Sequence, residues 1–371
     1  MKILFSGNTA WSMYNFRRKI FESCISDGIE VVVVAPEDNF FSKRIMDMGC
    51  KFIHIDISRK GTNPLQDYLL YRSYKKILNQ EKPDGCFFYT IKPNIYGGMA
   101  AGSLDIPFIT ITTGLGYIFN NNNIVSKIAK KLYKISFRKA KKIWFLNQDD
   151  IDSFINEKII HKDKAKLLKG EGIDTEYFTF SKNNSETFSF ILIARLLWDK
   201  GVGIYVDAAK NLKKKYPRIE FKLLGAIDNN NPMGIPEKTI KEWHNEGIIN
   251  YMGEVQDVRP YINSSSCVVL PSFYREGIPL CLMEGAASGK PIITTDNVGC
   301  REVIRDGYNG FICKPQDTES LINAMENMMR LTNDERIAMG EKGRLLMETE
   351  FDIRLIEEEY KKAIRENFVY V

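Results

Sequence analysis

The chain has 371 residues, of which 44% are hydrophobic and 27% are charged, and its formal net charge is +5 at pH 7. This length is too great for one ordinary hydrophobic core and predicts two domains. The mild charge does not indicate a nucleic-acid binder, and the sequence lacks the run of about 18 apolar residues that predicts a membrane span. The first residues lead directly into a predicted strand, without the apolar region of a signal peptide. Seven scattered cysteines without a C-x-x-C pair are expected to be reduced, most of them in the core of a cytoplasmic protein.

Short apolar runs alternate with helical patterns through the first half of the chain. Unbroken apolar runs are typical of strands buried on both faces, so the alternation predicts a parallel, doubly wound sheet. The predicted strands cover residues 3–6, 30–35, 51–55, 85–89, 108–112, 142–146 and 166–169. Helical spacing between them predicts helices such as residues 16–26 and 65–79.

The second half repeats this organisation after a polar segment at residues 179–187, which is typical of a linker. Predicted strands follow at residues 188–194, 220–224, 249–253, 267–270, 291–295 and 310–313. We therefore expect an α/β chain with two Rossmann-like domains, residues 1–183 and residues 184–352. The last segment, about residues 353–371, contains a charged amphipathic helix that could pack on either domain. Ligands of such sheets bind beyond the carboxyl ends of the strands, and two such sheets can share one cleft.

The stretch over residues 271–291 predicts a strand end, a loop and the start of a helix. Gly277 permits a tight backbone, and Pro279 suits the first turn of a helix. The unpaired N–H groups of such a helix can bind a phosphate, with Glu276 before it and Glu284 inside the helix. A sugar and a ribose flanking a diphosphate fit this arrangement. Two solvated glutamates beside an ordinary turn fit the same spacing.

Two cations, Arg195 and Lys200, follow the first predicted strand of the second half. The arginine guanidinium can donate two parallel hydrogen bonds to phosphate oxygens, and the lysine ammonium can contribute a positive charge, so both residues could bind the same anion. The alternative is that they are ordinary charged surface residues. After the first strand of the chain, the small residues from Gly7 and Asn8 onward would let a ligand approach the backbone. A tight turn between strand and helix, without a ligand, is the alternative. The absence of G-x-G-x-x-G argues against a nicotinamide or flavin cofactor.

No metal site is expected, because the sequence has no Cys–His cluster, no H-E-x-x-H and only three histidines. The pair Asp150 and Asp152 could be a metal-binding D-x-D, but capping of a helix that opens here is the better interpretation.

Residues 123–142 combine many cations with apolar residues at helical spacing, which predicts a basic amphipathic helix. Such a helix can lie on an anionic membrane surface, or it can be a core helix with a solvated basic face. We favour membrane contact, and the cations that would provide it are Lys127, Lys130, Lys131, Lys134 and Arg138.

Several motifs of the second half resemble glycosyltransferase family 4, whose members are retaining enzymes of the GT-B fold. The matching motifs are Arg195 and Lys200, Gly253-Glu-Val255, Glu276 and Glu284 with Gly277, Asp296-Asn-Val-Gly-Cys-Arg-Glu302, Gly307-Tyr-Asn-Gly-Phe311 and Pro315-Gln-Asp317. Gly172-Ile-Asp174 resembles the family's segment before the linker. The first half departs from the family, with Gly7-Asn-Thr9 in place of a Gly-Gly pair and Thr112-Thr-Gly-Leu-Gly116 in place of a frequent histidine.

The resemblance implies roles for these residues. Arg195 and Lys200 would bind the diphosphate of a nucleotide sugar, Glu276 the transferred sugar and Glu284 the ribose, without a metal or cofactor. Further donor-side candidates are Gly277, Ile278, Leu280, Val255 and Gly7. Acceptor-side candidates are Asn8, Lys92, Thr113 and Gly114.

The string Ile193-Ala-Arg-Leu-Leu-Trp-Asp-Lys-Gly201 and the first half resemble bacterial transferases that add an N-acetylhexosamine to a polyprenyl-diphosphate-linked sugar. This resemblance implies a UDP-GalNAc or UDP-GlcNAc donor and a peripheral location on the cytoplasmic face of the inner membrane. It implies a role in O-antigen or other surface glycan assembly. The alternatives are a nucleotide-sugar epimerase of the same fold, a transferase for another hexose, and a non-enzymatic membrane scaffold.

Overall fold

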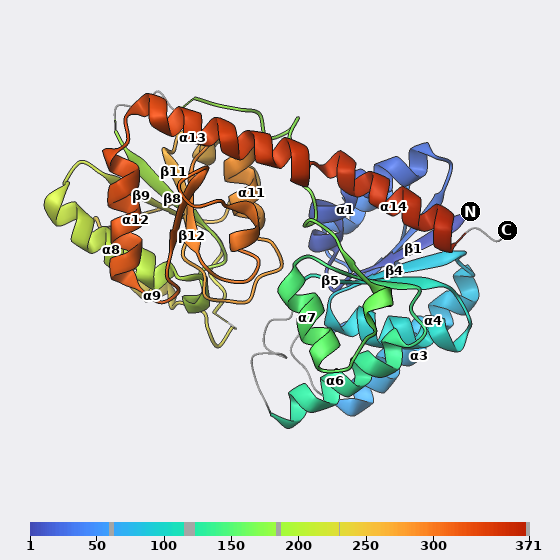
Figure 1. Ribbon diagram of the computed structural model, residues 1–371. Helices are drawn as coiled ribbons and strands as arrows, with labels where there is room; N and C mark the ends of the chain where they lie inside the picture. The colour runs from blue at the N-terminus through green and yellow to red at the C-terminus, as the bar shows by residue number, and fades with distance from the viewer. Residues whose placement is uncertain (59–62, 115–122, 183–186, 230, 369–371) are drawn as a thin grey trace. The chain divides into compact units, whose positions relative to one another are not determined.

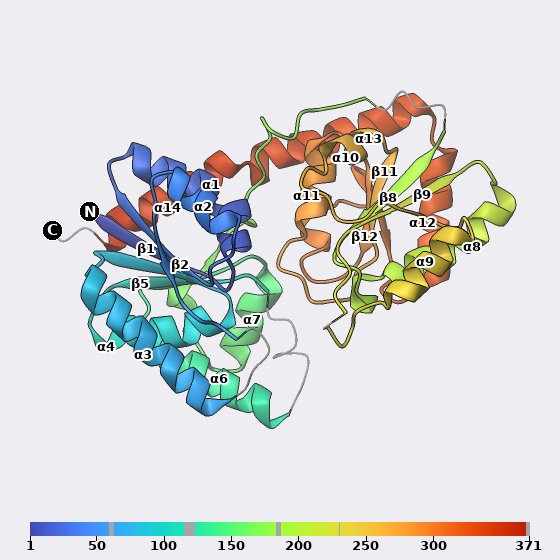
Figure 2. The same cartoon turned by 180° about the vertical axis from the view of Figure 1, so that it is seen from behind.

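The computed structural model describes residues 1–58, 63–114, 123–182, 187–229 and 231–368 (Figures 1 and 2). The chain divides into two compact units, one of residues 1–172 with 353–371 and the other of residues 173–352. This division precedes the polar segment that we expected as the linker. The expected boundary after residue 183 lies outside the described residues.

The first unit is built on a parallel sheet of seven strands in the order β3-β2-β1-β4-β5-β6-β7. Its strands are β1 (Lys2–Ser6), β2 (Glu30–Ala35), β3 (Lys51–His54), β4 (Gly85–Tyr89), β5 (Phe108–Thr112), β6 (Lys142–Phe145) and β7 (Ala165–Leu167). The strands β1, β2, β4, β5 and β6 consist mostly of buried residues, as the unbroken apolar runs predict, whereas the edge strands β3 and β7 are only partly buried. The strand order reverses between β1 and β4, so the loops after these two strands flank the crevice where doubly wound sheets bind ligands.

Helices cover both faces of this sheet (Figures 1 and 2). One face carries α1 (Ala10–Ser26) in contact with α14 (Ile353–Asn367), and α2 (Phe41–Asp47) packs against α1. The other face carries α3 (Pro64–Glu81), the π-helical turn η1 (Pro93–Gly97), α4 (Gly98–Ser103), α6 (Ile124–Phe137) and α7 (Gln148–Asn156). The short 3₁₀ turn η2 (Lys162–Lys164) leads into β7. The C-terminal helix therefore belongs to the first unit.

The second unit is built on a parallel sheet of six strands in the order β10-β9-β8-β11-β12-β13. Its strands are β8 (Ser189–Ile193), β9 (Glu220–Leu224), β10 (Asn250–Tyr251), β11 (Cys267–Leu270), β12 (Ile292–Thr295) and β13 (Gly310–Cys313). Here the order reverses between β8 and β11, the two strands that precede Arg195 and Glu276. The two parallel sheets confirm the predicted α/β class with two doubly wound halves.

The helices of the second unit also form two layers (Figures 1 and 2). On one face, α8 (Val202–Lys215) packs against α12 (Thr318–Arg330), near α9 (Glu237–Asn245). On the other face, α11 (Leu280–Ala287) packs against α13 (Asn333–Leu346). The remaining helical segments are η3 (Trp198–Lys200), α10 (Arg259–Asn263), η4 (Arg301–Val303) and η5 (Met347–Phe351).

All seven cysteines are unpaired and all but Cys281 are buried, as their positions in apolar runs predicted. None of the helices in the described part of the chain combines the length and apolar character needed to cross a bilayer.

Candidate active site

The candidate site of the second unit centres on a buried ion pair between Lys200 and Glu276. The Lys200 Nζ atom lies 2.5 Å from Glu276 Oε1, and the side chains are only 14% and 9% exposed. The Ser272 hydroxyl donates a second hydrogen bond to the same carboxylate oxygen, at 2.9 Å. Burial acts to lower the pKa of Lys200, but the carboxylate of Glu276 outweighs it and leaves this pKa raised. The lysine is therefore held as a cation in a place with little water.

The loop that carries Glu276 is held from two sides by backbone hydrogen bonds. The Asp199 carbonyl accepts from the N–H groups of Phe273 and Tyr274, both at 3.0 Å. From the other side, the Asn297 side chain donates to the Tyr274 carbonyl at 2.6 Å. Asp199 belongs to η3 and Asn297 follows β12, so the carboxyl ends of two different strands position this loop. The pair is thus oriented by the fold rather than by two long, free side chains.

Two glycines let these segments approach one another. Gly201 has φ +76°, and a Cβ atom on it would lie 2.0 Å from the Pro271 carbonyl oxygen. Gly299 has φ +81°, and a Cβ atom there would lie 2.2 Å from the Gly277 carbonyl oxygen. A side chain at either position would both strain the backbone and displace the loop of Glu276.

The second glutamate, Glu284, lies on the fifth residue of α11 and is 9% exposed. Burial, with a smaller effect of the Asp257 carboxylate, raises its pKa to about 7. Among the described residues, none donates a hydrogen bond to this carboxylate. No side chain caps the start of α11, and Pro279 is its N-cap. A buried acceptor therefore follows Glu276 by eight positions, and the helix between them begins without a side-chain cap.

Arg195 does not lie in the buried pair. Its side chain is 57% exposed, and its guanidinium lies 3.7 Å from the Asp228 carboxylate. Both cations follow β8, as predicted, but in this structure they contact different carboxylates. The predicted convergence of the two on one anion stays a prediction.

The other donor-side candidates of the second unit lie near the same strand ends. Gly277 and the buried Ile278 lie between Glu276 and α11, and Leu280 is the first residue of that helix. Val255 lies in the loop after β10. The same loop carries Asp257, whose charge acts on Glu284.

The acceptor-side candidates lie at three neighbouring strand ends of the first unit. Gly7 and Asn8 follow β1, Lys92 follows β4, and Thr113 and Gly114 follow β5. Gly7, which was predicted on the donor side, belongs to this unit as well, and its role stays a prediction. The segment that replaces the family's histidine continues through residues 115 and 116, which lie outside the described residues.

Several polar residues of these edges were missed by sequence reasoning. Ser272 and Asp199 support Glu276, and the Lys200 ammonium lies 5.1 Å from the centre of the Tyr274 ring. Their only sequence signal was proximity to Glu276 or Lys200. Burial raises the pKa of Asp199, whose Oδ1 atom has no hydrogen-bond partner in the described part of the chain.

In the first unit, sequence reasoning missed the partner of Lys92. Its ammonium lies 2.7 Å from the Asp67 carboxylate, in the first turn of α3. The two residues are 25 positions apart, so no local pattern indicated this contact.

The basic amphipathic segment forms helix α6, but its apolar stripe is buried only in part. Ile124, Ile128 and Ile135 are exposed, whereas Tyr133 and Phe137 enter the core. Leu132 of the stripe packs against the core as well, so α6 is a core helix whose apolar stripe is partly exposed. Lys130 lies 2.6 Å from the Glu157 carboxylate, so this cation is already paired.

The D-x-D segment lies at the start of α7, as expected, but neither of its aspartates is the N-cap. The N-cap is Asn147, whose side chain accepts from the Asp150 N–H at 2.8 Å. Asp150 is therefore in the first turn, where a carboxylate suits the helix dipole. Within the described ranges, no group of three His, Cys, Asp or Glu residues is arranged to hold a metal ion.

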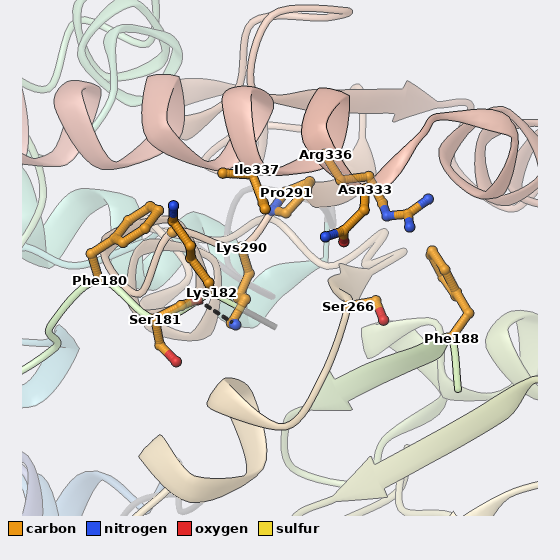
Figure 3. A pocket seen from close by; sticks show the side chains of 11 residues that line it. Phe180, Ser181, Lys182, Phe188, Ser266, Lys290, Pro291, Asn333, Arg336 and Ile337 are labelled. Atoms are coloured by element: carbon orange, nitrogen blue, oxygen red, sulfur yellow. Dashed lines mark hydrogen bonds between the residues drawn. The ribbon is translucent and has the colours of Figure 1, made fainter. Parts of the chain in front are cut away.

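A separate cavity of the second unit lies at the amino ends of β8, β11 and β12, opposite the edge that carries Glu276 (Figure 3). Its lining includes Lys290, whose ammonium donates to the carbonyls of Ser181 and Asn263, at 2.7 and 3.1 Å. Burial lowers the pKa of Lys290 to about 8. Because this ammonium donates its hydrogen bonds to backbone carbonyls, we interpret the role of Lys290 as structural and do not assign a ligand to the cavity.

Comparison with known domain families covers both halves of the chain. Residues 2–147 match the family "Glycosyl transferase 4-like", and residues 187–330 match "Glycosyl transferases group 1". The second match contains Arg195, Lys200, Glu276 and Glu284.

Two curated relatives resemble the chain over much of its length. An N,N'-diacetylbacillosaminyl-diphospho-undecaprenol alpha-1,3-N-acetylgalactosaminyltransferase of Campylobacter jejuni is 29% identical, with 98% of each chain covered. A UDP-Gal:alpha-D-GlcNAc-diphosphoundecaprenol alpha-1,3-galactosyltransferase of Escherichia coli is 24% identical, with 71% of this chain and 70% of the relative covered.

Solved structures share the fold. A glycosyltransferase of Rickettsia africae superimposes with a TM-score of 0.79 at 18% identity, with 98% of each chain covered. HepE of Anabaena, solved with UDP-glucose, superimposes with a TM-score of 0.78 at 17% identity, with 99% of this chain and 100% of HepE covered. Together with the two domain matches, these comparisons show that the chain contains a domain of each of these two glycosyltransferase families and is a glycosyltransferase of the GT-B fold.

Proposed function

We propose that this glycosyltransferase moves an N-acetylhexosamine, GalNAc or GlcNAc, from its UDP-sugar to a polyprenyl-diphosphate-linked saccharide. The product would serve bacterial surface polysaccharide or glycan assembly. The names of two relatives support the proposal, since both describe transferases that act on undecaprenyl-diphosphate-linked sugars. HepE, which shares the fold, was solved with UDP-glucose.

The observation that carries the proposal is the buried Lys200–Glu276 pair together with the buried carboxylate of Glu284, which accepts no hydrogen bond from the described residues. Glu276 would accept hydroxyl hydrogen bonds of the transferred sugar, and Glu284 would accept those of the ribose. The diphosphate between them would receive the N–H groups at the start of α11 and the charge of Lys200. Arg195 is exposed and would turn toward the diphosphate from its contact with Asp228.

The chemical role of the cations would be to stabilise the negative charge that develops on the departing UDP. Charges that are oriented before the reaction and shielded from water stabilise a transition state most effectively. Lys200 fits this role because the fold orients it in a buried place. We therefore propose a metal-independent transfer with retention, in which the leaving phosphate oxygen takes the acceptor proton on the face of attack.

The acceptor would bind at the strand ends of the first unit that carry Asn8, Lys92, Thr113 and Gly114. A polyprenyl chain stays in a bilayer, so this edge would work at a membrane surface. The exposed isoleucines and cations of α6 support such contact, because an interfacial helix has an apolar face beside basic residues.

A screen tests the proposal directly. Purified enzyme is incubated with UDP-sugars and with short-chain prenyl-diphosphate sugars, and products are identified by mass. We expect one hexosamine to be added with UDP-GalNAc or UDP-GlcNAc, and equal turnover when EDTA is present. Strict dependence on Mg²⁺ would contradict the metal-independent mechanism.

The same assay separates the proposal from the alternatives. An epimerase would convert UDP-GlcNAc in the absence of any acceptor, which we do not expect. A scaffold would bind vesicles but produce no glycoside with any donor. Transfer of glucose or galactose alone would keep the mechanism and correct the donor.

A further inference from the structure

Large apolar side chains are exposed at the amino ends of two helices of the first unit. On α3, Leu65 is 66% exposed and Leu69 is 54% exposed. On α6, Ile124 is 75% exposed and Ile128 is 54% exposed. Tyr68 and Val125 beside them are exposed as well. Isolated apolar residues on a surface are ordinary, but a contiguous set indicates a partner.

Both sets lie at the same edge of the sheet. Helix α3 follows β3 and α6 follows β5, and in a parallel sheet such helices begin at the carboxyl edge. The two helices cover the same face, and both pack against η1 (Figures 1 and 2). The 2.7 Å contact between Lys92 and Asp67 joins the loop after β4 to the first turn of α3. The exposed apolar residues of α3 therefore adjoin an acceptor-side candidate.

These exposed residues are not needed for the core. Helix α3 contributes Leu70, Tyr74 and Leu78 to the core of the first unit. Helix α6 buries Tyr133 and Phe137, together with two serines, on its inner face. Each helix therefore packs on the sheet through other residues, and the exposed apolar side chains do not contribute to that packing.

The charge around these residues is positive. Lys127 and Lys131 are exposed on α6, and Arg72 and Lys76 are exposed on α3. The first-turn carboxylate of α3, Asp67, is neutralised by Lys92. The exposed carboxylates Asp149 and Asp152 belong to α7, the next helix in the layer. Apolar residues among cations are the composition that suits an anionic bilayer.

We propose that α3 and α6 together form a bilayer-docking surface, made of Leu65, Tyr68, Leu69, Ile124, Val125 and Ile128. The apolar side chains enter the headgroup region of an anionic membrane, and the surrounding cations contact the lipid phosphates. This proposal rests on the proposed function, in which the acceptor is lipid-linked. The proposed membrane contact of α6 is thereby extended to include α3. The strand ends that would bind the acceptor would then lie beside the bilayer.

Co-sedimentation with vesicles tests the surface. The probes are vesicles of phosphatidylglycerol with phosphatidylcholine, and vesicles of phosphatidylcholine alone. The variant is L65S/L69S/I128S, and the matched control is M46S/L345S/L355S, which replaces apolar residues of similar exposure on α2, α13 and α14. We expect the first variant to lower the partition coefficient on anionic vesicles roughly a hundredfold, and the control to change it less than about threefold.

The lysines give a second, independent readout. K127Q/K131Q should weaken binding to anionic vesicles about ten- to thirtyfold and reduce its salt dependence. Binding of the L65S/L69S/I128S variant at the wild-type level would overturn the docking surface. So would a dimer in wild-type protein that this variant abolishes, because the surface would then bind a second copy of the chain.

Turnover assays separate this proposal from the proposed function. With a short-chain, water-soluble acceptor, the L65S/L69S/I128S variant should turn over at the wild-type rate. With a long-chain acceptor in anionic vesicles, its rate should fall at least tenfold. Vesicle binding that depends on the surface, without transfer to any acceptor, supports the surface and contradicts the function. Transfer to both acceptors at the wild-type rate contradicts the surface and leaves the function intact.

Discussion

The two candidate ligand-binding edges of this enzyme differ in chemistry, although both belong to the same kind of sheet. In the second unit, the loops after the strands bury charged side chains and hold them by hydrogen bonds, as in Lys200, Glu276 and Ser272. In the first unit, the corresponding loops present small residues such as Gly7, Thr113 and Gly114, and the charged Lys92 is paired near the surface. A diphosphate requires fixed charges at fixed places, whereas a saccharide acceptor can be bound by loop shape and backbone groups.

The difference also explains why the second unit carries the more recognisable motifs. A buried ion pair tolerates few substitutions, because removing one partner leaves an unpaired charge in a poorly hydrated place. Loops that act through their backbone can change sequence while keeping their shape. The predictions below test whether the second unit is indeed the rigid, charge-bearing partner.

The largest effect is expected for Glu276→Ala and Lys200→Ala. Each change leaves a buried charge without its partner and removes a group that we propose to contact the donor, so kcat/KM should fall about a hundred- to a thousandfold. Initial rates with a UDP-sugar and a short-chain acceptor measure the loss. The control is Lys215→Ala, which breaks the more exposed contact with Glu326 and should keep full activity. Full activity in both site variants would remove the assigned roles.

A smaller but still large effect is expected for Gly201→Ala. The new Cβ atom would meet the Pro271 carbonyl at 2.0 Å in a left-handed conformation, so the loop of Glu276 must shift. We expect the free energy of unfolding to fall by about 2–4 kcal/mol, with a matching loss of activity. Gly247→Ala is the control, since it has φ +69° but no atom within 4 Å, and should cost about 1 kcal/mol. Urea unfolding of both variants measures the difference, and equal losses would show that the close approach to Pro271 is unimportant.

The affinity for the donor is expected to depend on pH because of Glu284. Its carboxylate accepts best when ionised, and its pKa is about 7. Donor affinity should therefore weaken about three- to tenfold as the pH falls from 8 to 6, within the range of a charge-assisted hydrogen bond. Calorimetric titration with UDP measures the affinity at each pH. Glu284→Gln should bind more weakly at pH 8 and lose this dependence; a dependence that persists in the variant would assign it to another group.

Replacing Glu284 by glutamine is expected to increase the free energy of unfolding at high pH. The pKa of Glu284 is raised above the ordinary value of 4.5, so the folded state favours the protonated form. Stability from this group is present below pH 4.5 and is lost as the pH rises toward 7. Glu284→Gln should therefore stabilise the fold at pH 8 by on the order of 2–3 kcal/mol and by little at pH 4.5. Thermal unfolding at the two pH values checks this.

An effect as small as the pH dependence is expected in the first unit, for Lys92→Met. The Lys92–Asp67 contact is only partly buried, with side chains 15% and 18% exposed. We expect the KM for the acceptor to rise about three- to tenfold while the KM for the UDP-sugar stays the same. Asp67→Asn is the partner variant; it frees Lys92 and should change the acceptor KM less than Lys92→Met. An equal rise for donor and acceptor would contradict the separate roles of the two edges.

The sequence by itself determined the strands, their order along the chain and the residues at their carboxyl ends. Short unbroken runs of β-branched and other apolar residues, such as Val31–Val34 and Val268–Leu270, are typical of strands buried on both faces, and these residues are buried. The sequence also showed that Arg195, Lys200, Glu276 and Glu284 follow strands of the second half, at the edge where a doubly wound sheet binds its ligands.

Only the tertiary structure decided which of these residues meet. Lys200 and Glu276 are 76 positions apart, and their contact depends on how the loops after β8 and β11 pack together. The structure likewise showed that Ile124 and Ile128 face outward on α6, which a helical repeat cannot reveal. The periodicity of apolar residues indicates that they share one face of a helix. Whether that face packs on a sheet or remains exposed depends on contacts distant in sequence, which the local pattern does not encode.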